Sequence, residues 1–185
     1  MAKVRLYEDI DGCLNASHNA RGWRRPDDDG DAGYERGAVA PVYDDDGQYT
    51  QSASGFAYKM EWNSRLISEM NILDVDWVWT TTWRQDALAV GKLMGLTPKN
   101  ERVLHPLSGK TTFPSIEWKF DAILYEQDHD PSPFIAVDDE WHDSTDTLMY
   151  EALTSIGGLV ITPDPNIGLT PQHIQKMWEY IQKTQ

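Results

Sequence analysis

Short apolar segments that end on acidic or hydroxyl side chains recur along this chain, and they constrain its fold more than any other feature. The segment 3–9 and the segment "PFIAVDD" at 133–139 both end on aspartate, and "VDWVWTTTW" at 75–83 contains three consecutive threonines. Apolar runs of this length are typical of buried strands. A short run at 102–105 and the segment "GGLVITPD" at 157–164 predict two further strands.

Segments with helical spacing separate these strands. Residues 62–73 carry apolar side chains three and four positions apart, with Asn63 or Ser64 as the expected cap. Strands that alternate with helices across short links favour an α/β domain with a doubly wound, Rossmann-like sheet. We expect about five mainly parallel strands with helices on both faces. The other predicted helices span 84–95, 115–127, 144–153 and the end of the chain from the N-cap Thr170.

Residues 16–57 differ in composition from the rest of the chain. They contain "RRPDDDGDAG" and "YDDDGQY", which are rich in aspartate, glycine and proline and poor in aliphatic side chains. This composition predicts loops or a hairpin inserted after the first strand, and not a core element. We expect one domain over residues 1–185, in which residues 16–57 form a small cap or flap.

The composition excludes several classes of protein. An apolar content of 40% and eight tryptophans exclude a disordered chain. The formal charge of −14 disfavours binding to long nucleic acid, which is itself negatively charged. No apolar run is long enough to span a bilayer, and no signal-peptide core precedes Asp9. With Cys13 as the single cysteine, we expect a cytoplasmic protein without a membrane partner.

The predicted topology brings the polar strand ends to one edge of the sheet. In an open parallel α/β sheet, ligands bind at the carboxyl ends of the strands. Placing several acids together there is costly unless a cation compensates their charge. Either these strand ends are turns that happen to be acidic, or a cation and a reaction belong at this edge. The side chains concerned are Asp9, Asp11, Thr80, Thr81, Thr82, Asp138, Asp139 and those near Asp164.

Four short motifs, in this order along the chain, resemble those of the haloacid dehalogenase-like (HAD) superfamily. They are Asp9-Ile10-Asp11-Gly12 with Asn15, the strand end at Thr81, Lys119 on a predicted helix, and Asp138-Asp139. The resemblance covers nearly the whole chain, and segments such as "WTTTWR" and "VDDEW" are similar to small HAD-domain proteins of actinobacteria and their phages. A single DxDG motif is weak support, whereas four motifs in register are a specific pattern.

The resemblance implies a phosphohydrolase that uses carboxylates for its chemistry. By similarity to the family, Asp9 is the nucleophile that forms an aspartyl-phosphate, and Asp11 protonates the leaving oxygen and then activates water. Thr81 is expected to hydrogen-bond a phosphoryl oxygen. Lys119 is expected to neutralise charge on the nucleophile and the phosphate. Because dehalogenases of the family lack an acid at the position of Asp11, its presence favours hydrolysis of a phosphate ester.

The resemblance also implies a metal site. The expected ligands are the side chain of Asp9, the backbone carbonyl of Asp11 and the side chain of Asp138, with Asp139 close behind. Such an all-oxygen site suits Mg²⁺, although the sequence does not distinguish it from Mn²⁺. Glu8 departs from the family pattern, in which an apolar residue precedes the nucleophile. Its side chain either points away from the core or adds a third acid near the site.

Other residues are candidates for contacts with the substrate. Thr82 is an alternative to Thr81, and Arg84 is expected to contact the substrate phosphate or to lie on the surface. In the insertion, Trp23 and Arg24 could stack on a base and hold an anion, or simply form part of an exposed loop. Lys110 in "SGKTT" is a rival to Lys119 for the role of stabilising the phosphate.

These expectations lead to one preferred function and two alternatives. The preferred function is Mg²⁺-dependent hydrolysis of a small phosphomonoester, for which a nucleotide is one candidate, in an open site on a monomer or homodimer. The first alternative is removal of a 3′- or 5′-end phosphate from nucleic acid. The second is a non-catalytic module that uses the same fold to bind a partner protein.

Overall fold

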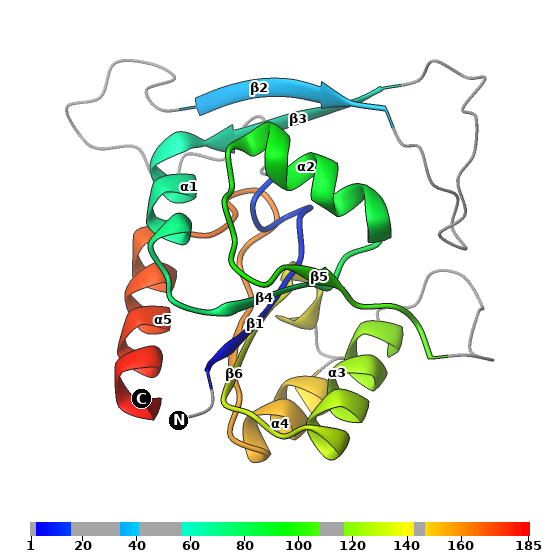
Figure 1. Ribbon diagram of the computed structural model, residues 1–185, viewed down its shortest axis with the longest axis vertical. Helices are drawn as coiled ribbons and strands as arrows, with labels where there is room; N and C mark the ends of the chain where they lie inside the picture. Colours follow the sequence, from blue (N-terminus) through cyan, green and yellow to red (C-terminus); the bar gives the residue numbers. More distant parts are fainter. Residues whose placement is uncertain (1–2, 16–33, 41–56, 108–116, 143–146) are drawn as a thin grey trace.

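A five-stranded parallel sheet forms the centre of the protein, with the strand order β5-β4-β1-β6-β7 (Figure 1). The computed structural model describes residues 3–15, 34–40, 57–107, 117–142 and 147–185. The predicted α/β class, with a doubly wound sheet of parallel strands, is confirmed. The strands are β1 (Arg5–Glu8), β4 (Asp76–Trp79), β5 (Arg102–Val103), β6 (Phe134–Val137) and β7 (Leu159–Ile161).

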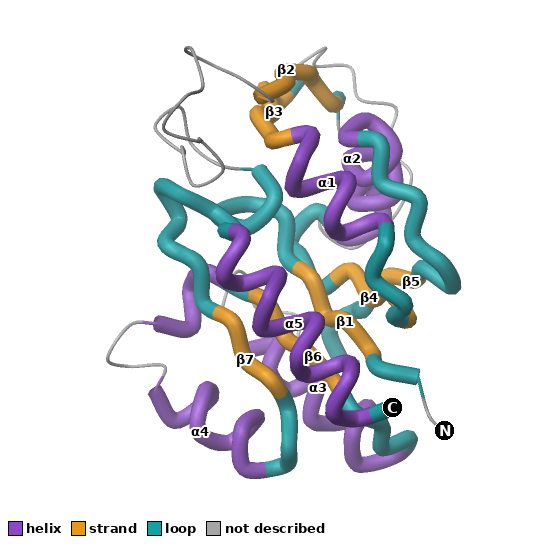
Figure 2. Tube along the Cα trace, turned by 90° about the vertical axis from the view of Figure 1, so that its left-hand side faces the viewer, coloured by secondary structure: helices purple, strands orange, loops and turns teal. Residues whose placement is uncertain are grey.

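Helices cover both faces of this sheet, as Figures 1 and 2 show from two directions. The helices α1 (Ser64–Asn71), α2 (Ala87–Met94) and α5 (Pro171–Thr184) share one apolar core with Leu6 of β1. Helices α3 (Glu117–His129) and α4 (Thr147–Ser155) pack on the other face, in a second core with Tyr7. Among the described helices, none has the length and apolar character that crossing a bilayer requires.

Local sequence signals fix where these helices begin and end. The side chain of Asn63 accepts hydrogen bonds from the backbone of Arg65 and Leu66, at 2.9 and 3.4 Å, so Asn63 is the cap of α1. Helix α2 ends at Gly95, whose φ of 85° is the left-handed conformation that glycine adopts readily. Thr170 and His173 form a capping box at the start of α5. Thr170 is therefore the N-cap of this helix, as predicted.

The strand order places a switch point beside β1. From β1 the chain proceeds to β4 and β5 on one side, and it then returns to place β6 and β7 on the other side. Loops that leave neighbouring strands in opposite directions open a crevice at the carboxyl edge of the sheet. The residues that follow β1 and β6 therefore meet at the position where this fold class binds ligands.

A two-stranded hairpin accompanies the central sheet. Strand β2 (Tyr34–Val39) lies within the predicted insertion, and it pairs antiparallel with β3 (Tyr58–Asn63), which directly follows the insertion. In Figure 1 the hairpin lies across α1 and α2. Met60 and Trp62 of β3 are buried in the domain core. At Gly37, a Cβ would come within 2.9 Å of the Leu93 side chain, so β2 packs closely on α2.

Candidate functional site

A buried lysine joins the loops that follow β1 and β6. The ammonium nitrogen of Lys119 donates hydrogen bonds to Asp9 Oδ2 at 2.6 Å and to Asp138 Oδ2 at 2.7 Å. All three side chains are at most 7% exposed. Lys119 comes from the first turn of α3, so an element distant in sequence completes the pairing of two strand ends. The structure thus brings together three residues that the sequence predicted to act together.

Backbone groups fix the remaining oxygens of these two aspartates. The N–H of Ile10 donates to Asp9 Oδ1 at 2.7 Å, and the N–H of Glu140 donates to Asp138 Oδ1 at 3.0 Å. Each carboxylate therefore accepts one bond from the backbone and one from Lys119. Hydrogen bonds of this kind to an ionised group are short and strong, and they hold both carboxylates in fixed orientations.

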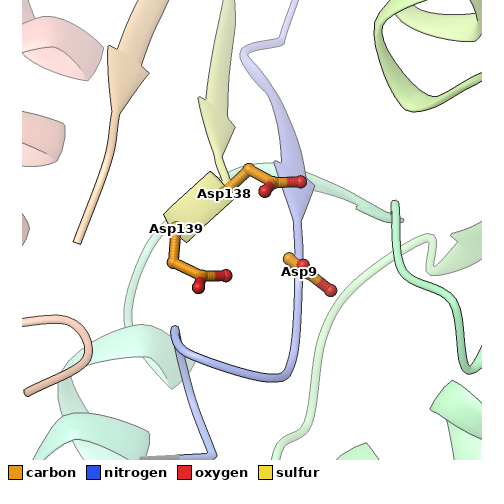
Figure 3. A group of neighbouring side chains, drawn as sticks. All are labelled: Asp9, Asp138 and Asp139. Carbon is orange, nitrogen blue, oxygen red and sulfur yellow. The ribbon is translucent and has the colours of Figure 1, made fainter. Parts of the chain in front are cut away.

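Asp139 completes a cluster of three acids, which Figure 3 shows side by side at the ends of β1 and β6. Carboxylate oxygens of Asp9, Asp138 and Asp139 all lie within 4.8 Å of one another. Gly12 makes room for Asp139, because a Cβ at this position would overlap the Asp139 carboxylate. Three carboxylates with this spacing are an all-oxygen donor set, and they fit the preference of Mg²⁺.

The electrostatics of the cluster show an excess of negative charge. Burial raises the pKa of Asp138 to about 8, an effect that the charge of Asp9 increases and that of Lys119 opposes. Burial, followed by the charges of Asp9 and Glu140, raises the pKa of Asp139 to about 6. Burial alone would lower the pKa of Lys119, but the two aspartates outweigh it and raise that pKa. One lysine therefore does not balance the acids, and a divalent cation would.

Asp11 lies outside this buried cluster. Its side chain is exposed, and both carboxylate oxygens accept hydrogen bonds, one from Asn15 Nδ2 at 2.7 Å and one from Trp83 Nε1 at 2.8 Å. The acid follows Asp9 on the turn that leaves β1, where Gly12 has a φ of +69°. The backbone of Asp11 pairs with Asn15 in an isolated bridge, which closes this turn.

The threonines follow β4, next to β1. The N–H of Thr80 donates to the carbonyl of Glu8 at 2.8 Å, and this bond extends the parallel ladder to the edge where Asp9 lies. Thr80 and Thr81 are buried, whereas Thr82 is exposed. The Oγ1 of Thr81 accepts a hydrogen bond from the Trp83 backbone at 3.4 Å. Thr81 therefore lies at the expected edge, and its contact with a phosphoryl oxygen stays a prediction.

Arg84 follows directly and has an unusual backbone. Its φ of 47° is left-handed, a conformation that side chains other than glycine rarely adopt. Burial, followed by the charge of Arg84, lowers the pKa of His105, the second residue after β5. The remaining predicted substrate contacts, Trp23 and Arg24, and the rival Lys110 lie outside the described residues.

Glu8 does not point away from the core. Its side chain is fully buried, and neither of its oxygens has a hydrogen-bond partner among the described residues. Burial, together with the charges of Asp9 and Asp138, raises the pKa of Glu8 well above its usual range. Because residues two apart on a strand share a face, Glu8 shares the face of Leu6, and the other face carries Tyr7. Glu8 is therefore a buried acid next to Asp9, and not a surface residue.

Two contacts of the site were missed by sequence reasoning. Trp83 is the last residue of the segment 75–83, and its indole reaches Asp11, which is 72 positions earlier in the chain. Asn15 was noted only as part of the first motif, yet its Oδ1 also accepts the N–H of Glu61 in β3 at 2.9 Å. No local pattern signals either contact, because each depends on how distant loops meet.

Comparison of the chain with protein-family models, curated proteins and solved structures gives no match.

Proposed function

We propose that the protein is a Mg²⁺-dependent phosphohydrolase of the HAD type, which cleaves small phosphomonoesters through an aspartyl-phosphate on Asp9. The observation that carries this proposal is the buried ammonium of Lys119 between Asp9 and Asp138. A structural ion pair needs one carboxylate for each lysine. Here Lys119 bonds two of the three acids in the cluster, and this surplus of carboxylates suits a site that receives a divalent cation and a phosphate.

In the first step, a carboxylate oxygen of Asp9 attacks the phosphorus atom of the ester. The bond between phosphorus and the leaving oxygen breaks, and Asp11 supplies the proton that the leaving alkoxide takes up. Lys119 contacts the attacking carboxylate and balances charge that accumulates on the phosphoryl group. Mg²⁺ held by Asp9, Asp138 and Asp139 would neutralise phosphoryl oxygens when bound.

In the second step, water attacks the phosphorus atom of the aspartyl-phosphate. Asp11, now ionised, removes a proton from this water, and the bond between phosphorus and the Asp9 oxygen breaks. Inorganic phosphate leaves and Asp9 returns to its carboxylate form. The N–H of Ile10 and Lys119 fix the orientation of the Asp9 carboxylate. This supports both steps, because the oxygen that attacks in the first step is the one whose bond to phosphorus breaks in the second.

The exposure of Asp11 supports the proposal of a small, soluble substrate. Asp9 is only 5% exposed, whereas Asp11 faces solvent, so the leaving group would project outward from the cluster. The strongly negative charge of the chain disfavours long polyanions at this opening. A small phosphomonoester, with nucleotides among the candidates, fits these two properties.

Phosphate release from a panel of alkyl, aryl and nucleoside monophosphates tests the proposal. We expect release with Mg²⁺, none with EDTA, and a loss of at least 10³-fold in Asp9→Asn, because the amide cannot form the phosphoenzyme. Asp128→Asn is the matched control, since Asp128 is 85% exposed at the far end of α3 and the chemical change is the same. This control variant should retain wild-type rates.

Two outcomes would redirect the assignment. Release from the 3′ or 5′ ends of oligonucleotides, with no release from mononucleotides, would favour the end-phosphatase activity over a small substrate. Failure to hydrolyse any ester by a folded, Mg²⁺-binding protein would overturn the enzymatic proposal and favour a binding module.

A further inference from the structure

The side chain of Asp11 is held more firmly than its exposure requires. An exposed carboxylate is fully solvated by water and needs no protein partner. Here the amide of Asn15 and the indole of Trp83 each donate to one oxygen, at 2.7 and 2.8 Å. Both free rotations of the side chain are therefore restricted, although restricting an exposed side chain costs conformational entropy.

The same two donors also contact the β2–β3 hairpin. The Oδ1 of Asn15 accepts the N–H of Glu61 at 2.9 Å, so this one amide connects the hairpin backbone to Asp11. The ring of Trp83 meets the ring of Tyr58 edge to face, with centroids 5.2 Å apart and planes at 74°. Glu61 and Tyr58 both belong to β3, so a single strand supports both donors.

We propose that Asn15 and Trp83 are positioning residues, which hold the Asp11 carboxylate for proton transfer to the leaving group, and that β3 keeps both in place. This inference rests on the proposed phosphohydrolase function. General acid catalysis requires the acid within hydrogen-bonding distance of the leaving oxygen, and small displacements are costly. A two-point support converts a mobile surface carboxylate into an acid of fixed position.

The hairpin thereby gains a role beyond packing against α2. Met60 and Trp62 anchor β3 in the core, so their burial fixes the strand that carries Tyr58 and Glu61. The chain of contacts runs from the core through β3 to the two donors and ends on Asp11. The acid is thus supported by Asn15 within its own turn and by Trp83 and β3 from outside it.

The variant Trp83→Phe tests the first link. It removes the N–H donor and keeps a ring that can pack against Tyr58. The measured quantity is kcat/KM, which reports the steps up to departure of the leaving group, for an alkyl phosphate and for 4-nitrophenyl phosphate. An alkoxide needs the proton of Asp11, whereas 4-nitrophenolate leaves without one. We expect a loss of roughly ten- to a hundredfold on the alkyl ester and less than about threefold on the aryl ester.

Further variants separate positioning from general damage. Asn15→Ala should show the same dependence of kcat/KM on the leaving group. Tyr58→Ala should also lower kcat/KM more on the alkyl ester than on the aryl ester, but by a smaller factor. Trp178→Phe is the matched control, because Trp178 is also half-buried but lies on α5, and it should change neither rate. In the background of Asp11→Asn, the change Trp83→Phe should cause no additional loss, since its effect passes through Asp11.

The outcomes for the two esters distinguish this inference from the function on which it rests. If the wild type hydrolyses neither ester, the proposed function fails. If the wild type hydrolyses both and Trp83→Phe reduces both equally, or changes neither, the positioning role is overturned. A further loss from Trp83→Phe in the Asp11→Asn background would also overturn it.

A measurement on the metal-free protein provides a test without turnover. In a ¹H–¹⁵N spectrum, the indole resonance of Trp83 is identified as the one missing in Trp83→Phe. We expect Asp11→Ala to shift this resonance far more than the other indole resonances, because the bond at 2.8 Å is lost. An unchanged Trp83 resonance in Asp11→Ala would show that the indole does not hold the acid in solution.

Discussion

Gly12 lies directly against the carboxylate of Asp139, which begins the short 3₁₀ helix (Asp139–His142) that follows β6. A Cβ on Gly12 would come within 2.6 Å of Asp139 Oδ1, and the φ of +69° at Gly12 independently disfavours a side chain. The turn after β1 therefore has two reasons to carry glycine. One is its backbone conformation, and the other is the space that the third acid of the cluster occupies.

The variant Gly12→Ala is expected to weaken Mg²⁺ binding by about tenfold or more, because the new methyl group displaces Asp139. Isothermal titration of Mg²⁺ into the substrate-free protein measures this. Gly95→Ala is the matched control, since Gly95 has a similar φ of +85° but no atom within 4 Å of the added Cβ. It should lower the free energy of unfolding by about 1 to 2 kcal/mol and leave metal affinity unchanged. Equal effects of the two variants on affinity would contradict this account.

Lys119→Met is expected to destabilise the metal-free protein by about 3–5 kcal/mol, because it leaves buried carboxylates without their cation. The lysine side chain is 2% exposed, so solvent cannot replace it. Urea denaturation measures the change in the free energy of unfolding. The double variant Lys119→Met with Asp138→Asn should recover part of this loss, because one buried charge is removed as well. A single variant as stable as the wild type would show that the ion pair is not formed.

Mg²⁺ affinity is expected to increase with pH. With pKa values raised to about 6 for Asp139 and about 8 for Asp138, both acids hold protons at low pH, and a cation must displace them. The affinity should rise by roughly tenfold per pH unit for each proton displaced, and it should level off above pH 8. Titration in buffers of different ionisation enthalpy counts the released protons. Asp139→Asn should lose the part of the rise near pH 6, and affinity independent of pH would refute the prediction.

Glu8 is expected to make the folded protein less stable as pH rises. Its pKa is raised well above 4.5, so above that pH the unfolded chain releases a proton that the folded chain retains. The unfolded state then binds fewer protons, and the free energy of unfolding falls with increasing pH. Glu8→Gln should remove this contribution, so its stability relative to the wild type should increase from pH 5 to pH 8.

Denaturation at several pH values measures the effect of Glu8. The control is Glu151→Gln on the exposed surface of α4, which should follow the wild-type curve. If Glu8→Gln tracked the wild type across the whole range, the acid would have a partner in solution.

Much of the site could be predicted from the sequence because strand ends are local signals. An apolar run that stops on aspartate fixes where Asp9 and Asp138 leave the sheet, and parallel pairing then brings those ends together. The register Glu8↔Val137 aligns the last residues of β1 and β6, so the acids that follow are neighbours. The pattern of strand ends predicted the edge where these acids lie, and the family resemblance singled out which of them to expect in the cluster.

The orientation of Glu8 could not be predicted in the same way. Both faces of β1 are covered by helices, so its alternating side chains do not divide into an apolar and a polar side. The contact between Trp83 and Asp11 was also beyond the sequence, because it depends on the path of the loop after β4. Strand β3 carries the alternation of apolar and polar residues that is typical of a strand, but β2 lies in a segment of loop-like composition, so their pairing was not predicted.

The place of β1 in the sheet has a consequence for how the protein is made. Arg5 pairs with Asp76 on one side and with Phe134 on the other, so both strands that pair with β1 are synthesised well after it. During synthesis, its acids emerge from the ribosome long before β6 exists, and no cation site can form on the nascent chain. Such distant pairings close late in folding. A divalent ion held between the ends of β1 and β6 would then stabilise the pairing of two strands that lie far apart in the chain.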